Sequence, residues 1–252
     1  MIGYMNNFND LVRFGVMTND MKDFLIKSIN RKKNILFVGG GSSEEIALLK
    51  ASVNHIHPEH SIVIVERPLN INKDRYKDNK CKSIIDNSKC IIDNIDKSYL
   101  DRTIIGECRW PEELHFFVHV GEMHGSNYLA TLTADNPKEA LYKLSMLYYQ
   151  LNKTNINKIN TIIAESVNII VQVEKIEDNS IKVLSIGEVI GFGGIEIIEE
   201  MNRHIYKNMI DPKLIIEENT DALTKTFHIR DMFKHEKETN KFINTGWMPM
   251  FK

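Results

Sequence analysis

Apolar residues fall along this chain in patterns that predict strands alternating with helices. Residues 34–38 end in an unbroken apolar run, residues 61–65 and 101–106 contain two further candidates for buried strands, and residues 128–133 are another strand candidate. Runs that are apolar throughout, rather than at every second position, are typical of strands buried on both faces. We therefore expect a parallel sheet covered by helices on each side.

Helical spacing separates these runs. Four apolar residues follow the N-cap candidates Thr18-Asn19-Asp20 at helical spacing and predict an amphipathic helix over residues 20–30. Asn136-Pro137 gives a similar start signal for a helix that runs to about residue 151, and Pro111 opens a third predicted helix. After a charged loop at residues 70–82, a fourth predicted helix has an apolar stripe made of Ile84, Ile85, Ile91, Ile92 and Ile95.

Beyond residue 153 the pattern changes from alternation to consecutive strands. Residues 168–174 and 181–188 are typical of strands, and the polar turn Glu177-Asp178-Asn179-Ser180 joins them, which predicts a hairpin. Gly191-Phe192-Gly193-Gly194 then predicts a bend. From Ile195 onward the sequence is charged and helical in pattern.

Composition narrows the function classes without choosing one. The chain has 252 residues, 42% of them hydrophobic, and its 32 basic and 34 acidic residues give a net charge of -2. This composition excludes a disordered or fibrous protein, and the charge balance predicts no nucleic-acid partner. Three cysteines without metal or redox spacing, and an N-terminus without a leader pattern, predict a cytoplasmic protein.

A glycine-rich turn between a predicted strand and a predicted helix is the first candidate site. The turn reads Gly39-Gly40-Gly41-Ser42-Ser43. A helix that opens in this way points unpaired N–H groups at a ligand, as in the phosphate-binding P-loop G-x-x-x-x-G-K-[ST]. Counted from Gly39, however, the Gly, Lys and Ser/Thr positions carry Glu44, Glu45 and Ile46. Spacing alone therefore favours a structural turn over a nucleotide site.

Other segments flank this turn in a fixed order. They are residues 10–18, the stretch 34–51, Glu66-Arg67-Pro68-Leu69-Asn70, Gly106-Glu107-Cys108-Arg109 with Pro111-Glu112 behind it, His124-Gly125-Ser126, residues 130–136, Pro137-Lys138-Glu139-Ala140-Leu141 and residues 171–191. In this order they resemble the linker, P-loop, Asp box, Walker B segment, His box and closing hairpin of the hexameric secretion ATPases. That family powers type II and type IV secretion and Flp/Tad pilus assembly. The resemblance covers residues 10–194.

The resemblance implies a fold and a set of site residues. The fold is α/β: a RecA-like P-loop NTPase fold with a mostly parallel central sheet, helices on both faces and a C-terminal β-hairpin. The implied parts are a linker remnant and first helix at 1–30, a RecA-like ATPase-type domain at 31–194 and a C-terminal helical appendage at 195–252. The family's catalytic positions, retained as a working or a vestigial set, match Glu107, Arg109, Glu66 and His124. The degenerate nucleotide-binding loop consists of Gly39, Gly40, Gly41, Ser42, Ser43, Glu44, Glu45 and Ile46.

Departures from the family pattern fall on the residues that handle phosphate and magnesium. Glu45 replaces the P-loop lysine, which turns an attraction of roughly 4 kcal/mol between charges about 4 Å apart into a repulsion of that order. Ile46 offers no oxygen, the ligand that magnesium takes. Asn70 stands where the carboxylate that activates water is expected, and Thr133 stands where the His box has its second histidine.

These departures predict a pseudo-ATPase: a secretion-ATPase-like subunit that hydrolyses no ATP and acts as a structural or regulatory partner in a type II or type IV secretion, conjugation or pilus assembly machine. Its expected partners are an intact ATPase of the family or a membrane platform protein, in a homomeric or mixed ring. We expect it in the cytoplasm or peripherally at the inner face of the plasma membrane, and we expect no cofactor. Two alternatives stay open: an active ATPase that holds ATP and magnesium through an unorthodox P-loop, and an unrelated cytoplasmic α/β binding protein.

Histidines and cysteines give weaker candidates for a metal site. His115 and His119 stand four positions apart, with Glu122 and His124 beyond, but a solvated or interface helix face is the favoured explanation. His55, His57 and His60 are typical of a polar turn. Cys81, Cys90 and Cys108 lack the spacing of the zinc site that some family members carry, so no metal is predicted.

Overall fold

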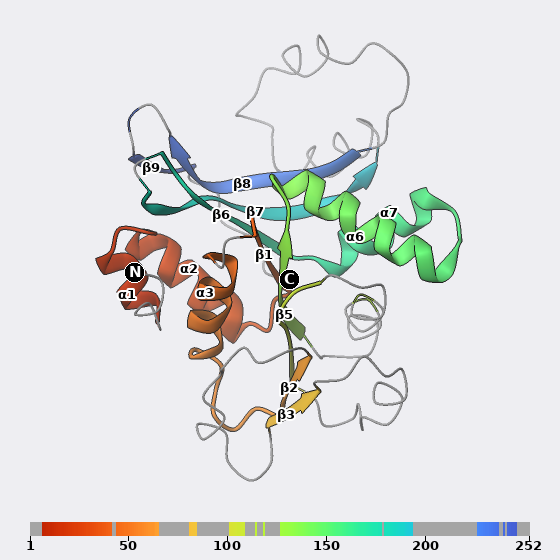
Figure 1. Cartoon of the computed structure of the whole chain (residues 1–252), viewed down its shortest axis with the longest axis horizontal. Helices are drawn as coiled ribbons and strands as arrows, with labels where there is room; N and C mark the ends of the chain where they lie inside the picture. Colours follow the sequence, from red (N-terminus) through yellow and green to blue (C-terminus); the bar gives the residue numbers. More distant parts are fainter. Residues whose placement is uncertain are drawn as a thin grey trace, which may run out of the picture.

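The computed structural model places the described strands in one nine-stranded sheet with helices on both faces (Figure 1). It describes residues 7–41, 44–65, 81–84, 101–108, 114, 118, 127–177, 179–193, 226–236, 239 and 241–245, with the backbone alone at 81–84. The described helices are α1 (Phe8–Arg13), α2 (Asn19–Asn30), α3 (Glu44–Val53), α6 (Pro137–Asn152) and α7 (Ile156–Ser166). The strands are β1 (Ile35–Gly39), β2 (Ile62–Val65), β3 (Cys81–Ile84), β4 (Arg102–Ile105), β5 (Asn127–Thr133), β6 (Ile169–Lys175), β7 (Ile181–Gly193), β8 (Thr226–Glu236) and β9 (Lys241–Asn244).

The sheet is parallel in one part and antiparallel in the other. Its strand order is β3-β2-β4-β5-β1-β6-β7-β8-β9. Neighbours from β3 to β6 run parallel, whereas β7, β8 and β9 add antiparallel to one side. The mostly parallel sheet expected from the sequence is confirmed. Because parallel strands end at the same edge, the carboxyl ends of β1, β4 and β5 lie together, where α/β folds place their ligands.

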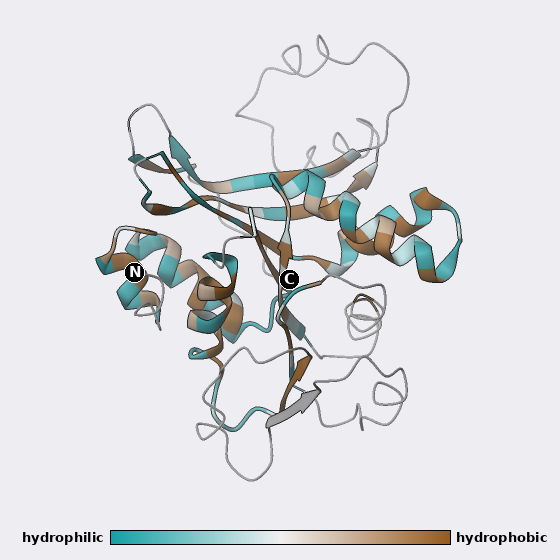
Figure 2. Ribbon diagram, in the orientation of Figure 1, coloured by the Kyte–Doolittle hydropathy of each residue, from teal (hydrophilic) through white to brown (hydrophobic). Residues whose placement is uncertain are grey.

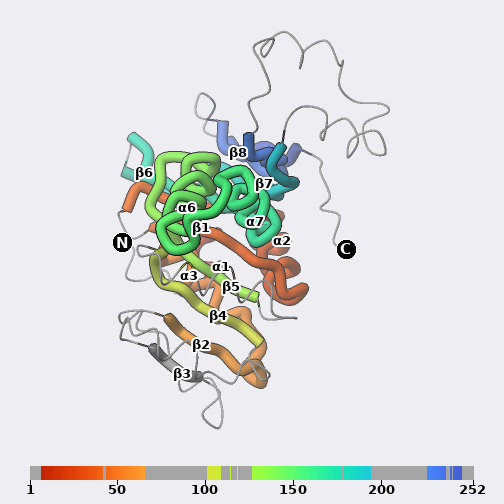
Figure 3. Tube along the Cα trace, turned by 90° about the vertical axis from the view of Figure 1, so that its right-hand side faces the viewer, coloured from red at the N-terminus to blue at the C-terminus, as the bar shows by residue number. Residues whose placement is uncertain are grey.

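Alternate residues of the central strands enter two separate cores, which explains the unbroken apolar runs. In β1, Ile35 and Phe37 belong to the core beneath α1, α2 and α3, whereas Leu36 and Val38 belong to the core beneath α6 and α7. All four side chains are fully buried. Figure 2 shows the apolar colouring of the central strands, and Figure 3 shows α6 and α7 side by side over one face of the sheet. The prediction that helices cover both faces is confirmed.

Side chains predicted as N-caps begin two of the helices. Thr18 Oγ1 accepts a hydrogen bond from the Met21 N–H at 3.2 Å at the start of α2. Asn136 Oδ1 accepts one from the Glu139 N–H at 2.9 Å at the start of α6, where Pro137 is the first helical residue. Both bonds satisfy N–H groups that have no partner inside the helix. None of the described helices is long and apolar enough to cross a membrane.

Arg102 fastens the start of β4 to the end of α2. Its side chain is fully buried, and its guanidinium donates to the carbonyls of Ile29 and Lys33. Burial lowers the pKa of Arg102 to about 10, against the raising effect of Asp101. A cation suits the carbonyl end of a helix dipole. These hydrogen bonds hold the start of β4 in place, and Glu107 follows the other end of the same strand.

Two predictions for the C-terminal half are wrong. Residues 226–236 and 241–244, expected in a helical appendage, form β8 and β9 of the main sheet. The physical reason is that β8 buries side chains on both of its faces: Phe227 in the core beneath α6, and Met232 in the core beneath α2. Gly191–Gly193, expected in a bend, lie inside β7, where the pairing register shifts between Val189 and Gly191.

The segment after β2 also differs from its prediction. Ile84, expected in a helix, ends β3, which pairs in parallel with β2. β3 reads Cys-Lys-Ser-Ile, and a short strand at the edge of a sheet needs no apolar run. The remaining residues of that predicted stripe (Ile85, Ile91, Ile92 and Ile95) lie outside the described residues, as does most of the helix predicted after Pro111.

Candidate functional site

The glycine turn follows β1 at the edge where the parallel strands end. Gly41 has a φ of 85°, a conformation that favours glycine. A Cβ on Gly41 would lie 3.2 Å from Cγ2 of Thr133, so the turn passes close to the end of β5. The Ala134 N–H donates to the Gly39 carbonyl at 2.9 Å. The described part of the turn is therefore held against β5; Ser42 and Ser43 lie outside the described residues.

Glu45, where the spacing from Gly39 leads one to expect the P-loop lysine, turns its carboxyl back toward the end of β1. The residue is 2% exposed. Its Oε2 lies 2.7 Å from the place that a Cβ on Gly39 would take, and the Val173 carbonyl oxygen lies 2.9 Å from the same place. Within the described residues, Glu45 Oε2 has no hydrogen-bond partner. The carboxyl thus fills the space that Gly39 leaves by having no side chain.

Burial and neighbouring charge both act on Glu45. Loss of hydration raises its pKa, and the nearby carboxylates of Glu44 and Glu107 raise it further, against a backbone hydrogen bond at residue 45 that lowers it. Glu44 is itself 4% exposed. The surroundings of Glu45 therefore favour its neutral acid form.

The described residues include no group of three or more His, Cys, Asp or Glu side chains that could hold a metal ion.

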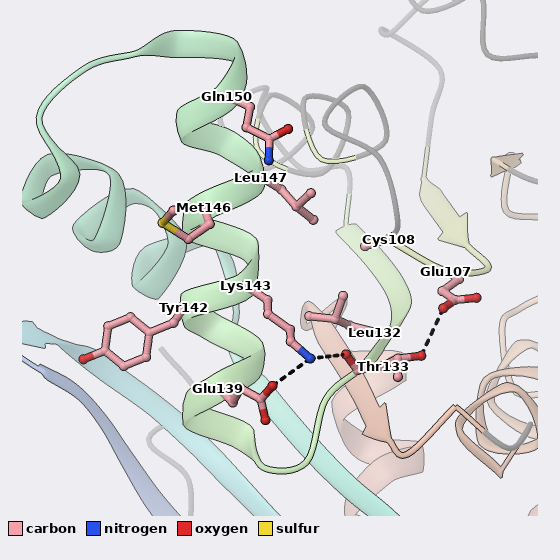
Figure 4. Close-up of a pocket in the computed structure, with 10 residues that line it drawn as sticks. All are labelled: Glu107, Cys108, Leu132, Thr133, Glu139, Tyr142, Lys143, Met146, Leu147 and Gln150. Atoms are coloured by element: carbon pink, nitrogen blue, oxygen red, sulfur yellow. Dashed lines mark hydrogen bonds and ion pairs between the residues drawn. The ribbon is translucent and has the colours of Figure 1, made fainter.

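Glu107 follows β4 and contacts the neighbouring strand. Thr133 Oγ1, at the end of β5, donates to Glu107 Oε1 at 3.0 Å (Figure 4). Thr133 therefore bonds to Glu107 and lies close to Gly41, so the carboxylate is held at the same edge as the turn. In the sequence, Thr133 stood out only because it takes the place of the second histidine expected in the His box. Its contacts depend on β5 lying between β1 and β4.

Several residues predicted for this site have no described position. They are Glu66, Asn70, Arg109 and His124, which were expected from the resemblance to the family's motifs, and the metal candidates His115 and His119. The described structure thus brings together Glu107 and the residues of the glycine turn. His55, predicted in a polar turn, stacks on Phe8, with ring centroids 4.6 Å apart.

An open groove of about 450 Å³ runs beside Glu107, between the ends of β4 and β5 and helix α6 (Figure 4). Lys143 on α6 is a charged group that the sequence did not single out. Its Nζ lies 2.7 Å from Glu139 Oε1 and donates to the Thr133 carbonyl at 3.3 Å. These contacts hold the ammonium at the end of β5. The hydrogen bond from Lys143, together with one from the Asp135 N–H, lowers the pKa of Glu139. The groove is lined by Glu107, Cys108, Leu132, Thr133, Glu139, Tyr142, Lys143, Met146, Leu147 and Gln150.

The residues described at the start of α3, after the turn, do not fit a magnesium nucleotide. P-loop chemistry needs an ammonium that reaches the phosphates and a hydroxyl that ligates magnesium. Position 45 supplies a buried acid instead, and the side chain of Ile46 packs against the core beneath α1, α2 and α3. Magnesium takes hard oxygen ligands, which an aliphatic side chain lacks.

Comparison with known proteins identifies the fold. No protein-family model matches the sequence, and a search of curated proteins gives no match. Among solved structures, the chain is similar to the VirB11 ATPase of the Brucella suis type IV secretion system in complex with sulphate, with a TM-score of 0.61 and 14% identity, covering 71% of this chain and 55% of that one. It is also similar to the Yersinia pseudotuberculosis ATPase DotB, with a TM-score of 0.51 and 10% identity, covering 76% of this chain and 50% of that one.

The chain therefore spans about half the length of the solved structures that it matches. The mostly parallel sheet with helices on both faces, which was expected from the sequence, agrees with the similarity to both structures. At these identities the likeness concerns the fold. The chain has the RecA-like α/β fold that it shares with the VirB11 and DotB ATPases.

Proposed function

We propose that this chain is a catalytically degenerate subunit of the secretion ATPase family. It is a pseudo-ATPase that acts as a structural or regulatory partner in a type II or type IV secretion, conjugation or pilus assembly machine. Two observations support this proposal: the fold that the chain shares with the VirB11 ATPase, and the residues Glu44, Glu45 and Ile46 that follow the glycine turn in place of Gly, Lys and Ser/Thr. The observation that carries it is the carboxyl of Glu45, buried against Gly39 at the position of the P-loop lysine.

Both protonation states of Glu45 oppose nucleotide binding. The ionised carboxylate would repel a phosphate by roughly 4 kcal/mol at a separation of about 4 Å. The neutral acid, which burial favours, supplies no positive charge. Movement of the side chain toward solvent would leave Gly39 beside an empty space. The turn is therefore suited to close the end of β1 and unsuited to hold a triphosphate.

The rest of the fold supports a role in assembly. Both cores are filled, the caps of α2 and α6 are formed, and Thr133 holds Glu107 in place. Such a subunit keeps the framework of the fold although its loop no longer binds phosphate. It can therefore still use the surface typical of the family to bind an intact ATPase or a membrane platform protein. We expect this subunit in the cytoplasm or peripherally at the inner face of the plasma membrane.

The alternative of a working ATPase rests on a different observation. The turn still precedes a helix, the arrangement that binds anions at helix N-termini, and Glu107 is retained after β4. In that case a neighbouring subunit would supply the positive charge that position 45 lacks. The two functions differ in one measurable property, which is magnesium-dependent turnover of ATP.

The test compares ATP binding and hydrolysis by the wild type with a repaired variant that carries Glu44→Gly, Glu45→Lys, Ile46→Thr and Asn70→Glu. We expect no magnesium-dependent binding by the wild type at millimolar ATP and saturable binding by the repaired variant. A matched control carries Glu45→Gln in place of Glu45→Lys, so it removes the negative charge without adding a positive one. We expect it to bind far more weakly than the lysine variant.

Each other outcome selects an alternative. Turnover by monodisperse wild type that disappears in Glu107→Gln would overturn the pseudo-ATPase and support the working enzyme. A folded repaired variant that gains no nucleotide binding would contradict a decayed site and support an unrelated binding protein. Co-purification with an intact ATPase of the family, tested with the wild type, measures the proposed partnership separately.

A further inference from the structure

The contact between the Glu45 carboxyl and Gly39 joins the two elements that flank the glycine turn. Gly39 ends β1, before the turn, and Glu45 stands in the first turn of α3, after it. The carboxyl lies in the space beside Gly39, with Oε2 2.7 Å from the place that a Cβ would take. The Glu45 side chain therefore packs the start of α3 against the end of β1.

The charges that act on this carboxyl are negative. They belong to Glu44, its neighbour on α3, and to Glu107, which follows β4. Strands β1 and β6 present Gly39 and the Val173 carbonyl oxygen at this place. Helices α1 and α2 and strand β5, which also contact α3, contribute no charge that acts on it. An ionised Glu45 would thus be buried beside two carboxylates and a carbonyl oxygen, which is unfavourable.

The start of α3 offers the ionised side chain a better place. The first N–H groups of a helix have no partner within the helix, and the positive end of the helix dipole lies there. Burial raises the pKa of Glu45 most strongly, but a backbone hydrogen bond at residue 45 acts in the opposite direction. The neutral acid is therefore favoured in the space beside Gly39, and the carboxylate is favoured in water at the start of the helix.

We propose that Glu45 is a proton-controlled switch that closes and opens residues 39–41 at the edge of the sheet. The neutral acid holds this segment against β5, where the Ala134 N–H donates to the Gly39 carbonyl at 2.9 Å and Gly41 lies close to Thr133. Loss of the proton drives the carboxylate out of the space beside Gly39. The end of β1 then loses its packing, and residues 39–41 separate from β5.

The direction of the switch follows from the burial of Glu45. The folded chain raises the pKa of this carboxyl above 4.5. The closed segment therefore has its full stability below the ordinary pKa, and this stability falls as pH rises toward the raised value. The switch concerns regulation and goes beyond the proposed pseudo-ATPase, because it requires no nucleotide.

Hydrogen exchange followed by NMR measures the switch in the full-length chain. The reporter is the Ala134 amide, which donates to Gly39. The reference is the Ile169 amide, which donates to the Asn34 carbonyl at 3.0 Å just before β1, at the opposite edge of the sheet. Protection factors correct for the intrinsic effect of pH on exchange. From about pH 5 to about pH 8 we expect the protection of the Ala134 amide to fall at least about tenfold.

At about pH 8 we also expect the Ala134 amide to be at least about tenfold less protected than the Ile169 amide, because the segment opens while the sheet stays folded. Glu45→Gln is the matched variant: it keeps the size of the side chain and cannot ionise. Its protection of the Ala134 amide is expected to differ by less than about twofold across the same pH range.

Glu44→Gln gives a second test that leaves Glu45 in place. Glu44 raises the pKa of Glu45, so its removal is expected to move the fall in Ala134 protection to lower pH. A fall that stays at the same pH or moves to higher pH would overturn the assignment of the switch to Glu45.

Three further results overturn the proposal. They are constant protection of the Ala134 amide in the wild type, an equal fall in Glu45→Gln, and equal protection of the Ala134 and Ile169 amides at about pH 8. The last result would mean that residues 39–41 open only when the whole chain unfolds. Circular dichroism at each pH establishes that the three proteins are folded. No measurement uses nucleotide, so the switch and the pseudo-ATPase stand or fall separately.

Discussion

Glu45 and Gly39 fit each other closely, and each restricts what the other position accepts. A side chain at position 39 would collide with the carboxyl of Glu45, and a lysine at position 45 would lack the carboxylate's fit beneath the strand end. The sequence identified the change of charge at positions 44 and 45. It could not show that the carboxyl turns inward, because that direction depends on the space between β1 and β6.

Glu45→Gln is expected to make stability less dependent on pH. The folded chain raises the pKa of Glu45 above 4.5, so it holds this proton more tightly than the unfolded chain. The wild type therefore loses stability as pH rises from the ordinary pKa toward the raised one, by about 1.4 kcal/mol for each pH unit that separates the two pKa values. The amide carries no such proton and shows no such loss.

Urea denaturation of both proteins between about pH 4 and about pH 8 measures this difference. Glu165→Gln is the matched control, since Glu165 is exposed on α7 and the chemical change is the same. A wild type and Glu45→Gln variant with parallel pH profiles would show that this carboxyl is not buried in solution.

Thr133→Val removes a hydroxyl and keeps the shape of the side chain. We expect a loss of about 1 kcal/mol in the free energy of unfolding, because Glu107 loses the donor at the end of β5. Thr161→Val is the control: its hydroxyl donates to the Asn157 carbonyl on an exposed helix face, and we expect a change within about 0.5 kcal/mol. Equal effects of the two substitutions would contradict the role given to Thr133.

Local sequence signals predicted most of the helices and strands that position the site. Caps and proline set the starts of α2 and α6, and apolar runs set β1, β2, β4 and β5. β3 was missed because its four residues carry a lysine and a serine. β8 was missed because the pattern of its buried residues changes face between Ile229 and Met232, which obscures a period of two.

Asn136→Ala tests the start of the helix that lines the groove. Loss of the cap leaves the Glu139 N–H without the Asn136 acceptor, and we expect the free energy of unfolding to fall by about 1 kcal/mol. Thermal unfolding measures it, with Lys138→Ala as a control on the exposed face of the same turn, expected to change stability by less than about 0.5 kcal/mol. A cap variant as stable as the control would contradict the assigned start of α6.

At the scale of the whole molecule, β8 joins the two cores and the sheet into one unit. Its residues Phe227 and Met232 enter opposite cores, although more than thirty residues separate β8 from β7 in the sequence. Sequence reasoning divided the chain after residue 194 because local pattern carries no information on such pairing. Contacts between distant segments, including Thr133 with Glu107, are the part of the fold and of the site that only the sheet order reveals.

Phe227→Ala is therefore expected to destabilise the whole chain by about 3–5 kcal/mol. Ile243→Ala, at a position that is 41% exposed on β9, should change stability by less than about 0.5 kcal/mol. Both should unfold in one cooperative transition when followed by circular dichroism and by fluorescence. A Phe227→Ala variant as stable as Ile243→Ala would mean that β8 is a loosely attached appendage.

We propose that the glycine turn keeps its place in the fold but binds no nucleotide. Calorimetric titration of magnesium-ATP into the wild type, up to millimolar concentration, tests this most directly. We expect no heat beyond dilution, because Glu45 stands where the P-loop lysine is expected and Ile46 offers magnesium no oxygen. Saturable binding by the wild type that requires magnesium and is lost in Glu107→Gln would contradict it.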